Sequence, residues 1–315
     1  MNEVLQQVVV LVLMMAVGFL VGRVKMIRSE GRDVLTKVVL NIASPALVIN
    51  SFQVEFNAQL LRDMALIAVF ATVSMALFFV LGKYMWPKGD DEKRRVLWQA
   101  TMFSNCGFMG YPVLYSLFGD TGVMYGAVYV MVFVVYSWTL GIHIYAGKTG
   151  GWKDILLQPG LIAVFVGLAF FLLRVHLPGP IVQTVKGIGA LNTPLAMLIV
   201  GLLVAEGDFK SLFREHTLFT GAAVRLIALP AVSLGVLWLL WQLGVPGMQA
   251  VASPAVRSCV LLTAMPIAAN VAIFAAMYNI KPQFAAQTVL VSTLFSVATV
   301  PLWMVAMQAV ARLGG

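Results

Sequence analysis

Ten apolar runs, each about as long as a bilayer is thick, constrain the fold of this chain more than any other feature. The hydrocarbon core of a bilayer measures roughly 30 Å, and a helix needs about 20 apolar residues to cross it. Runs of that kind occupy residues 4–24, 34–54, 61–86, 96–118, 121–146, 159–177, 180–206, 217–243, 250–279 and 284–312. A backbone in lipid must satisfy its own hydrogen bonds, as a helix does. We therefore predict an all-α membrane protein with ten transmembrane helices.

The composition excludes a soluble globular protein. Of the 315 residues, 61% are hydrophobic and 11% are charged, whereas a soluble domain has about 25% charged residues. The formal charge is +8, but the basic residues lie in short gaps between apolar runs. We therefore expect membrane lipid around the chain and no nucleic acid partner. Cys106 and Cys259 both lie inside apolar runs and match no metal-binding spacing, and we expect neither a metal nor a cofactor.

The distribution of basic residues predicts the orientation. If the N-terminus lies outside, the odd-numbered gaps face the cytoplasm, and these gaps with the adjoining helix ends hold 15 of the 21 lysines and arginines. Because cytoplasmic loops carry the excess of Lys and Arg, we expect both termini outside. Arg23, Lys25 and Arg28 follow the first run instead of preceding it, which is the reverse of a cleavable signal peptide.

The chain divides into two similar halves. A cytoplasmic linker at residues 148–158 separates residues 1–147 from residues 159–315, and each half contains five runs. Because five is an odd number, a duplicated five-helix unit inserts with opposite topology, as in transporters built from inverted repeats.

Two pairs of proline signatures support this duplication. The second helix of each half has a polar–proline signature, which comprises Asn41, Ser44 and Pro45 in the first half and Asn192, Thr193 and Pro194 in the second. The fourth helix of each half has a helix-breaking stretch, residues 104–112 with Pro112 and residues 263–270 with Pro266. The paired prolines are separated by nearly one constant offset. We predict that the fourth and ninth helices are broken and cross each other.

Such a crossing would form an anion site. A helix N-terminus carries roughly half a positive charge and free N–H donors, and two of them would meet there. Asn105 and Asn270 would add amide donors. The candidate substrate-binding residues are Asn105, Cys106, Gly107, Gly110, Tyr111, Pro112, Pro266, Ala268, Asn270, Asn41, Ser44, Asn192 and Thr193. The alternatives are prolines that only kink helices, glycines that serve close packing, and polar groups that only join helices.

Ionisable residues inside the runs are few. Arg225 and Arg257 lie about seven or eight residues inside their runs, where an ionisable residue is a functional candidate by default. Either could attract an organic anion, and snorkelling to the headgroups is the alternative. Acidic residues fall near helix ends, which argues against a cation antiporter. Proton coupling would need Glu206, Asp63, His143 or the substrate's own carboxyl group.

Three motifs carry a family resemblance. They are Gly18-x3-Gly22 with Arg23, then Leu40-Asn41-x3-Pro45-Ala46-Leu47 and, as the most specific, Asn105-x-Gly107-Phe108-x-Gly110-Tyr111-Pro112. On these motifs the chain resembles the auxin efflux carrier family over nearly its whole length. Its short central linker is similar to that of bacterial members, which are named as malonate and other carboxylate permeases, and this resemblance implies a bacterial inner membrane.

The resemblance also implies an architecture and a mechanism. Helices 1, 2, 6 and 7 would form a scaffold that dimerises, and helices 3–5 and 8–10 would form a transport domain with crossovers at Pro112 and Pro266. The transport domain would move like an elevator and carry a carboxylate held by Asn105 and its neighbours. Plant members place an acidic residue in a supporting site, and this chain has no clear counterpart near Pro45.

We therefore expect a secondary transporter of small organic anions, either mono- or dicarboxylates or auxin-like aromatic acids. A membrane-embedded anion sensor without transport is the alternative. An enzyme is disfavoured, because the chain has no HExxH, GxSxG, P-loop or paired intramembrane aspartate motif.

Overall fold

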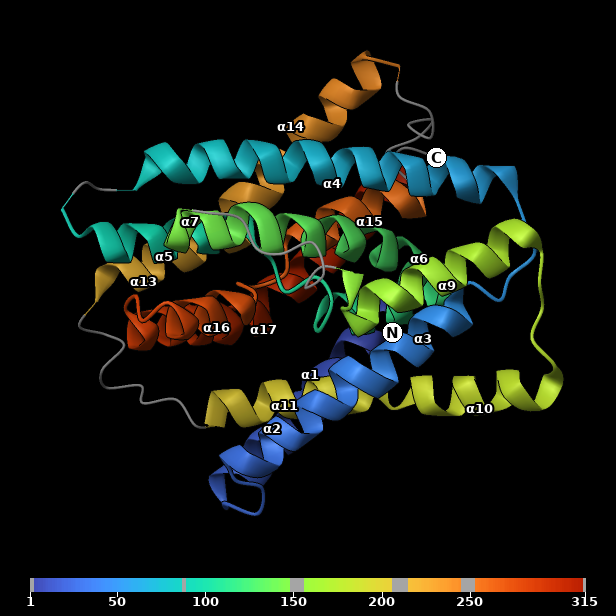
Figure 1. Ribbon diagram of the computed structural model, residues 1–315, viewed down its shortest axis with the longest axis horizontal. Coiled ribbons are helices and arrows are strands. Elements are labelled where there is room, and N and C mark those ends of the chain that lie inside the picture. The colour runs from blue at the N-terminus through green and yellow to red at the C-terminus, as the bar shows by residue number, and fades with distance from the viewer. Residues whose placement is uncertain (1–2, 87–88, 148–155, 206–214, 245–252, 314–315) are drawn as a thin grey trace.

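The computed structural model describes residues 3–86, 89–147, 156–205, 215–244 and 253–313 (Figure 1). In these residues every regular element is a helix, which confirms the all-α prediction, and one bridge between Ser104 and Ile267 is the sole strand-like pairing among them. The linker at 148–158 and Glu206 fall largely or wholly outside the described ranges.

The helices follow the apolar runs in order. Those of the first half are α1 (Glu3–Arg23), α2 (Ser29–Val38), η1 (Val39–Ala43), α3 (Ser44–Ser51), α4 (Ala58–Met85), α5 (Asp91–Met102), α6 (Gly110–Tyr136), η2 (Ser137–Gly141) and α7 (Ile142–Ala146). Those of the second half are α9 (Pro159–Leu173), α10 (Gly179–Ala190), α11 (Asn192–Ala205), α13 (His216–Ala223), η3 (Val224–Ala228), α14 (Leu229–Gln242), α15 (Pro254–Thr263), α16 (Asn270–Met277) and α17 (Pro282–Leu313). The elements η1, η2 and η3 are short π-helical turns.

Several of these helices can cross a membrane. Among the described residues, six helical stretches have the length and hydropathy for this: Ser29–Ser51, Ala58–Met85, Gly110–Ala146, Gly179–Leu202, His216–Gln242 and Pro282–Ala309. Three shorter apolar helices accompany them. The chain is thus a multi-pass membrane protein, and the number of ten spans stays a prediction.

The longest stretch contains a sharp turn. Gly119 interrupts α6 with φ 59° and ψ −145°, a backbone conformation that is open to glycine and costly for other residues. The turn falls between the apolar runs at 96–118 and 121–146, so residues 110–118 and 120–136 act as two separate helices.

The helices pack as two bodies. The first body consists of α1, α2, η1, α3, α9, α10 and α11: α1 lies along α11, and α3 packs against α9 and α10 (Figure 1). The second body consists of the remaining helices, with α4 against α5, α6 and α15, and α17 against α13 and α16. Contacts between the two bodies come mainly from α6, which packs against α3 and α9 and also touches α1 and α11. The helix α17 touches α1 and α11 as well.

The crossing of α1 and α11 depends on glycines. A Cβ atom added to Gly18 would collide with the backbone of Leu198, and one added to Gly201 would collide with the backbone of Met15 and Phe19. Small residues of this kind let two membrane helices approach until their backbones touch.

Three of the four signature prolines lie at the starts of helices, and the helix that contains Pro112 begins directly after an interruption at residues 103–109. Pro45, Pro112 and Pro194 each lie within the first turn of a helix, namely α3, α6 and α11. A first turn needs no N–H donor from that residue and accepts the fixed φ angle of proline. The helix through Pro45 runs on from Ser29 to Ser51, with the π-helical turn η1 before the proline. Pro266 is the one of the four that lies in a non-helical segment.

Candidate functional site

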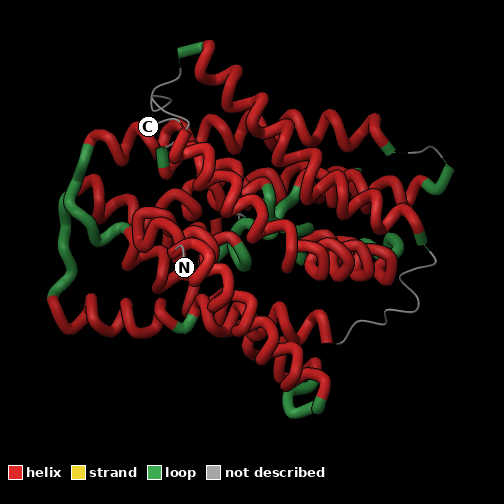
Figure 2. The backbone as a smooth tube through the Cα atoms, turned by 180° about the vertical axis from the view of Figure 1, so that it is seen from behind, coloured by secondary structure: helices red, strands yellow, loops and turns green. Residues whose placement is uncertain are grey.

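Two interrupted helices meet in the middle of the molecule. Residues 103–109 separate α5 from α6, and residues 264–269 separate α15 from α16. The two segments run antiparallel: the Asn105 N–H donates to the Pro266 carbonyl at 2.7 Å, and the Ala268 N–H donates to the Phe103 carbonyl at 3.0 Å. Figure 2 shows loop segments at the centre of the helical bundle. Here we call the two paired segments the crossing.

The crossing satisfies backbone groups that its broken helices would otherwise leave unpaired. Ser104 of the first segment and Ile267 of the second pair as a single antiparallel β-bridge. The Ile267 N–H also donates to the Ser292 hydroxyl of α17 at 3.1 Å. This pairing allows non-helical backbone to persist among apolar helices. It leaves two helix N-termini, those of α6 and α16, at the crossing.

The crossing has an accessible part. Asn105, Gly107 and Phe108 are half-buried in the first segment. In the second, Ala269 is exposed and Asn270 is half-buried, with its Nδ2 donating to the Ser137 hydroxyl at 3.2 Å. Both asparagines that the sequence singled out are thus partly exposed in this structure.

Other predicted site residues of the crossing are buried. Cys106, Tyr111 and Ala268 are at most 3% exposed, and Gly110, Pro112 and Pro266 are also buried. In this conformation these residues pack inside the core at the crossing and present no surface to a ligand.

The two polar–proline signatures also meet, as a second polar contact. The Ser44 hydroxyl donates to Asn192 Oδ1 at 2.6 Å, and both side chains are buried. This contact joins α3 to α11 within the first body.

Asn41 does not join that pair. Its side chain is exposed and donates to the Lys37 carbonyl one turn back. In a regular α-helix, the spacing of three residues would place Asn41 and Ser44 on one face. The π-helical turn η1 (Val39–Ala43) inserts an extra residue, which rotates the following face by about 100°.

A cavity of about 350 Å³ lies between the two bodies. Residues of α1, α3, α10 and α11 line one side, and residues of α6 on both sides of its turn at Gly119 line the other. Its polar lining residues are Asn50, Tyr115, Ser116, Asp120, Lys186 and Thr193, and Pro194 lines it as well. Asn50 Nδ2 donates to Asp120 Oδ1 at 3.2 Å across the boundary between the bodies. The cavity has the size of a small-molecule site.

Arg225 lies behind the crossing and is 1% exposed. Its Nε donates to the Met265 carbonyl at 3.2 Å, its Nη1 to the Thr101 carbonyl at 2.9 Å, and its Nη2 to the Thr263 carbonyl at 2.6 Å. The sequence offered Arg225 as a residue that could attract an organic anion or extend to the headgroups. The structure instead directs its donors at the C-terminal ends of α5 and α15, a role that the sequence pattern did not reveal.

Arg257, the second arginine inside an apolar run, does not bind these carbonyls. Arg257, near the start of α15, is half-buried, and its guanidinium carbon lies 4.8 Å from the centre of the Phe118 ring. His143 is exposed on α7.

Asp63 is a buried polar residue that sequence analysis placed near a helix end. It is 6% exposed on α4 and accepts hydrogen bonds from the Tyr125 hydroxyl at 2.6 Å and from Gln59 Nε2 at 2.8 Å. Its position just inside an apolar run was the available signal. A buried carboxylate held by neutral donors is a candidate for proton handling.

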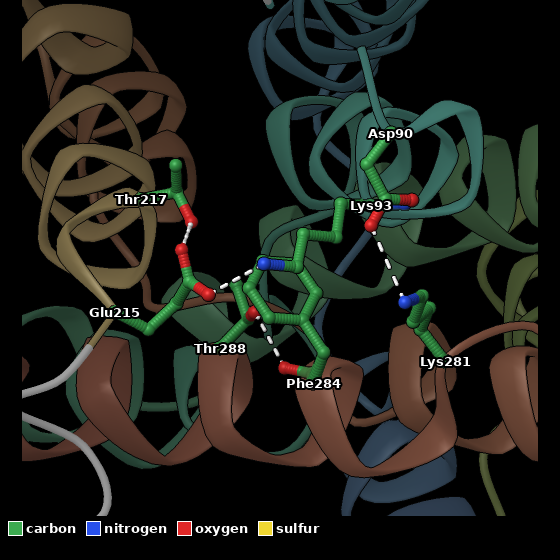
Figure 3. A network of polar contacts seen from close by, with 7 residues as sticks. All are labelled: Asp90, Lys93, Glu215, Thr217, Lys281, Phe284 and Thr288. Atoms are coloured by element: carbon green, nitrogen blue, oxygen red, sulfur yellow. Dashed lines mark hydrogen bonds and ion pairs between the residues drawn. The ribbon is translucent and has the colours of Figure 1, made fainter.

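A network of polar contacts connects the starts of three helices in the second body (Figure 3). Lys93 Nζ lies 2.5 Å from Glu215 Oε2, and Lys281 Nζ lies 3.3 Å from Asp90 Oδ2. The hydrogen bond from Lys93 holds the pKa of Glu215 below its usual value. The Lys93 backbone N–H, helped by Lys281, does the same for the pKa of Asp90. These contacts link the starts of α5, α13 and α17. No group of three potential metal ligands occurs among the described side chains.

A multi-pass helical protein with these features is a membrane transporter, as its relatives show. The chain belongs to the membrane transport protein family, whose sequence profile matches residues 3–154 and 150–304. This confirms the resemblance to auxin efflux carriers.

Relatives cover almost the whole chain. It is 27% identical over 314 residues to an "Uncharacterized transporter" of Methanothermobacter thermautotrophicus, covering 96% of this chain and 97% of the relative. It is 24% identical over 308 residues to the "Uncharacterized transporter YfdV" of Escherichia coli K12, covering 93% and 94%. It is 25% identical over 308 residues to the "Putative malonate transporter" of Rhizobium meliloti, covering 90% and 89%. The family and these names indicate a transporter and not an enzyme.

Proposed function

We propose that this protein is a secondary transporter of small organic anions with a carboxylate group. The observation that carries the proposal is the crossing, where two helix N-termini lie beside the half-buried side chains of Asn105 and Asn270. Helix N-termini attract anions through their partial positive charge and their free N–H groups. The two amides add neutral donors, so the site needs no lysine or arginine in contact with the substrate.

The two bodies suggest how the substrate site would open first to one side of the membrane and then to the other. The first body corresponds to predicted helices 1, 2, 6 and 7 and would be the scaffold, through which two copies would form a dimer. The second body contains the crossing and would be the transport domain. The cavity lies between them, and Asn50 and Asp120 join them by a hydrogen bond that sliding would break. Movement of the second body along the first is the elevator form of alternating access.

The membrane arrangement follows the predicted topology. Ten spans as two inverted five-helix repeats would place both termini outside a bacterial inner membrane. The Lys93–Glu215 network would then lie at the cytoplasmic surface, which agrees with the excess of basic residues there.

The relative named for malonate makes a small dicarboxylate the first substrate to test. The half-buried Phe108 at the crossing would also suit the apolar part of a longer or aromatic acid. Malonate, propionate and indole-3-acetate therefore form a minimal panel.

Flux of labelled acids into liposomes that contain the purified protein tests the proposal. We expect uptake of at least one acid of the panel, and loss of most of that uptake in Asn105→Ala. Gly187→Ala is the control, because a Cβ atom there meets no other atom within 4 Å. Unchanged flux in Asn105→Ala would remove the crossing as the substrate site. Binding without flux would support the sensor instead.

A further inference from the structure

One buried arginine completes the electrostatics of the crossing. Arg225 on η3 donates to the carbonyl oxygens of Thr101, Thr263 and Met265. Thr101 belongs to the last turn of α5, Thr263 ends α15, and Met265 follows in the non-helical segment. One guanidinium thus binds the C-terminal ends of both half-helices that enter the crossing. We propose that Arg225 gives the crossing its preference for anions without contacting the anion; this inference rests on the proposed function.

Four helix ends with opposite partial charges meet at the crossing. A helix carries roughly +0.5 charge at its N-terminus and −0.5 at its C-terminus. The ends of α5 and α15 lie at the same crossing as the starts of α6 and α16. Without a further charge, the two negative ends would offset the two positive ends, and the crossing would attract anions only weakly.

Arg225 removes this cancellation. Its guanidinium stays protonated in proteins and carries a full positive charge, which offsets two half-charges at the C-terminal ends. The starts of α6 and α16 then remain as the net charge of the crossing, close to +1. Because the arginine and the carbonyls are buried, water screens this charge weakly.

The geometry explains why arginine occupies this position. The three accepting carbonyls belong to different segments, and the planar guanidinium reaches them with Nε, Nη1 and Nη2 at once. The guanidinium carbon also lies over the Phe78 ring, 5.9 Å from the ring centre, where a cation is attracted. Lysine keeps the charge but offers a point donor instead of a fork. Arg225 is therefore a positioning residue for the crossing as well as its source of charge.

The test compares a carboxylic acid with its neutral amide of the same shape. Acetate and acetamide, propionate and propionamide, and indole-3-acetate and indole-3-acetamide are the probes. The readout is the ratio of the two dissociation constants, obtained by thermal shift of the full-length protein in detergent. A merely structural role for Arg225 weakens acid and amide alike and leaves this ratio unchanged.

The variants are Arg225→Gln, which removes the charge, and Arg225→Lys, which keeps it. Arg174→Gln is the matched control, because that side chain lies over the Phe56 ring in the first body and outside the crossing. We expect the acid-to-amide preference to fall by about tenfold or more in Arg225→Gln and to persist in Arg225→Lys and Arg174→Gln.

Each outcome decides the matter. If Arg225→Gln folds and keeps the wild-type preference, the proposal is wrong while anion transport stands. If Arg225→Gln does not fold, Arg225→Lys decides: loss of the preference with the charge retained overturns the proposal. A wild-type protein that binds acid and amide equally, which needs no variant, would overturn both this inference and the proposed function.

Discussion

Asn105 and Pro266, which come from different halves of the chain, are joined by a backbone hydrogen bond of 2.7 Å. The bond makes each broken helix complete the other, since the Ala268 N–H returns a second bond to Phe103. A site formed in this way lies between the two halves and belongs to neither alone. It also fixes the distance between the starts of α6 and α16, on which the proposed anion site depends.

The Ser44–Asn192 contact should stabilise the first body. Ser44→Ala removes the hydroxyl donor and leaves buried Asn192 Oδ1 without it, which we expect to cost about 1–3 kcal/mol. Denaturation in detergent measures the loss. A double-mutant cycle with Asn192→Ala isolates the pair, and purely additive effects would show that the contact contributes nothing.

The packing of α1 on α11 should tolerate no side chain at Gly201. A Cβ atom there would collide with the backbone of Met15, and backbone cannot move aside as a flexible side chain does. We expect Gly201→Ala to lower the thermal midpoint sharply or to abolish folded protein, as seen by fluorescence size exclusion. Gly187→Ala, also helical but in open space, should be neutral or slightly stabilising. Equal behaviour of the two variants would contradict the tight crossing.

The Tyr125–Asp63 hydrogen bond is expected to be strong. A neutral hydroxyl that donates to a carboxylate is worth about 1.5–3 kcal/mol, so Tyr125→Phe should destabilise the protein by an amount in that range. Tyr84→Phe serves as the control, because Tyr84 is 74% exposed. If Asp63 also handles the coupling proton, Asp63→Asn should remove the pH dependence of flux while binding persists. Flux with an unchanged pH profile would exclude that role.

The Lys93–Glu215 network should weaken in acid. The pKa of Glu215 is lowered in the folded protein by its hydrogen bond from Lys93, so its contribution to stability is present at neutral pH. That contribution is lost as the pH falls below about 4.3, the value of an unperturbed glutamate. Both side chains are about one-third exposed, which limits the effect to less than about 1 kcal/mol.

Thermal midpoints between about pH 7 and about pH 3 measure this effect, because the loss occurs below the pKa of an unperturbed glutamate. Glu215→Gln should show a smaller acid-induced decrease than the wild type, and Lys93→Met should show the same reduction. A decrease of the same size in all three proteins would assign the acid sensitivity to other groups.

Local features of this chain could be predicted from its sequence more fully than its long-range contacts. All ten apolar runs contain helix in their described residues, and the interruptions at 103–109 and 264–269 fall within or beside the predicted helix-breaking stretches. Hydrophobicity and glycine–proline clusters act locally, so they are readable without tertiary structure. The different surroundings of Asn41 and Ser44 could not be read in this way, because the π-helical turn η1 between them changes the local geometry.

The sequence by itself determined that this protein is helical, membrane-embedded and interrupted at two matched places, since these properties follow from the apolar runs and local backbone chemistry. Tertiary structure alone decided which groups meet. Arg225 acts on carbonyls far from it in the chain, and Ser44 meets Asn192 across the two halves. Buried donors pair with the acceptors that lie close to them in the folded protein. Which acceptors these are depends on how the helices pack against one another, and no local sequence pattern specifies it.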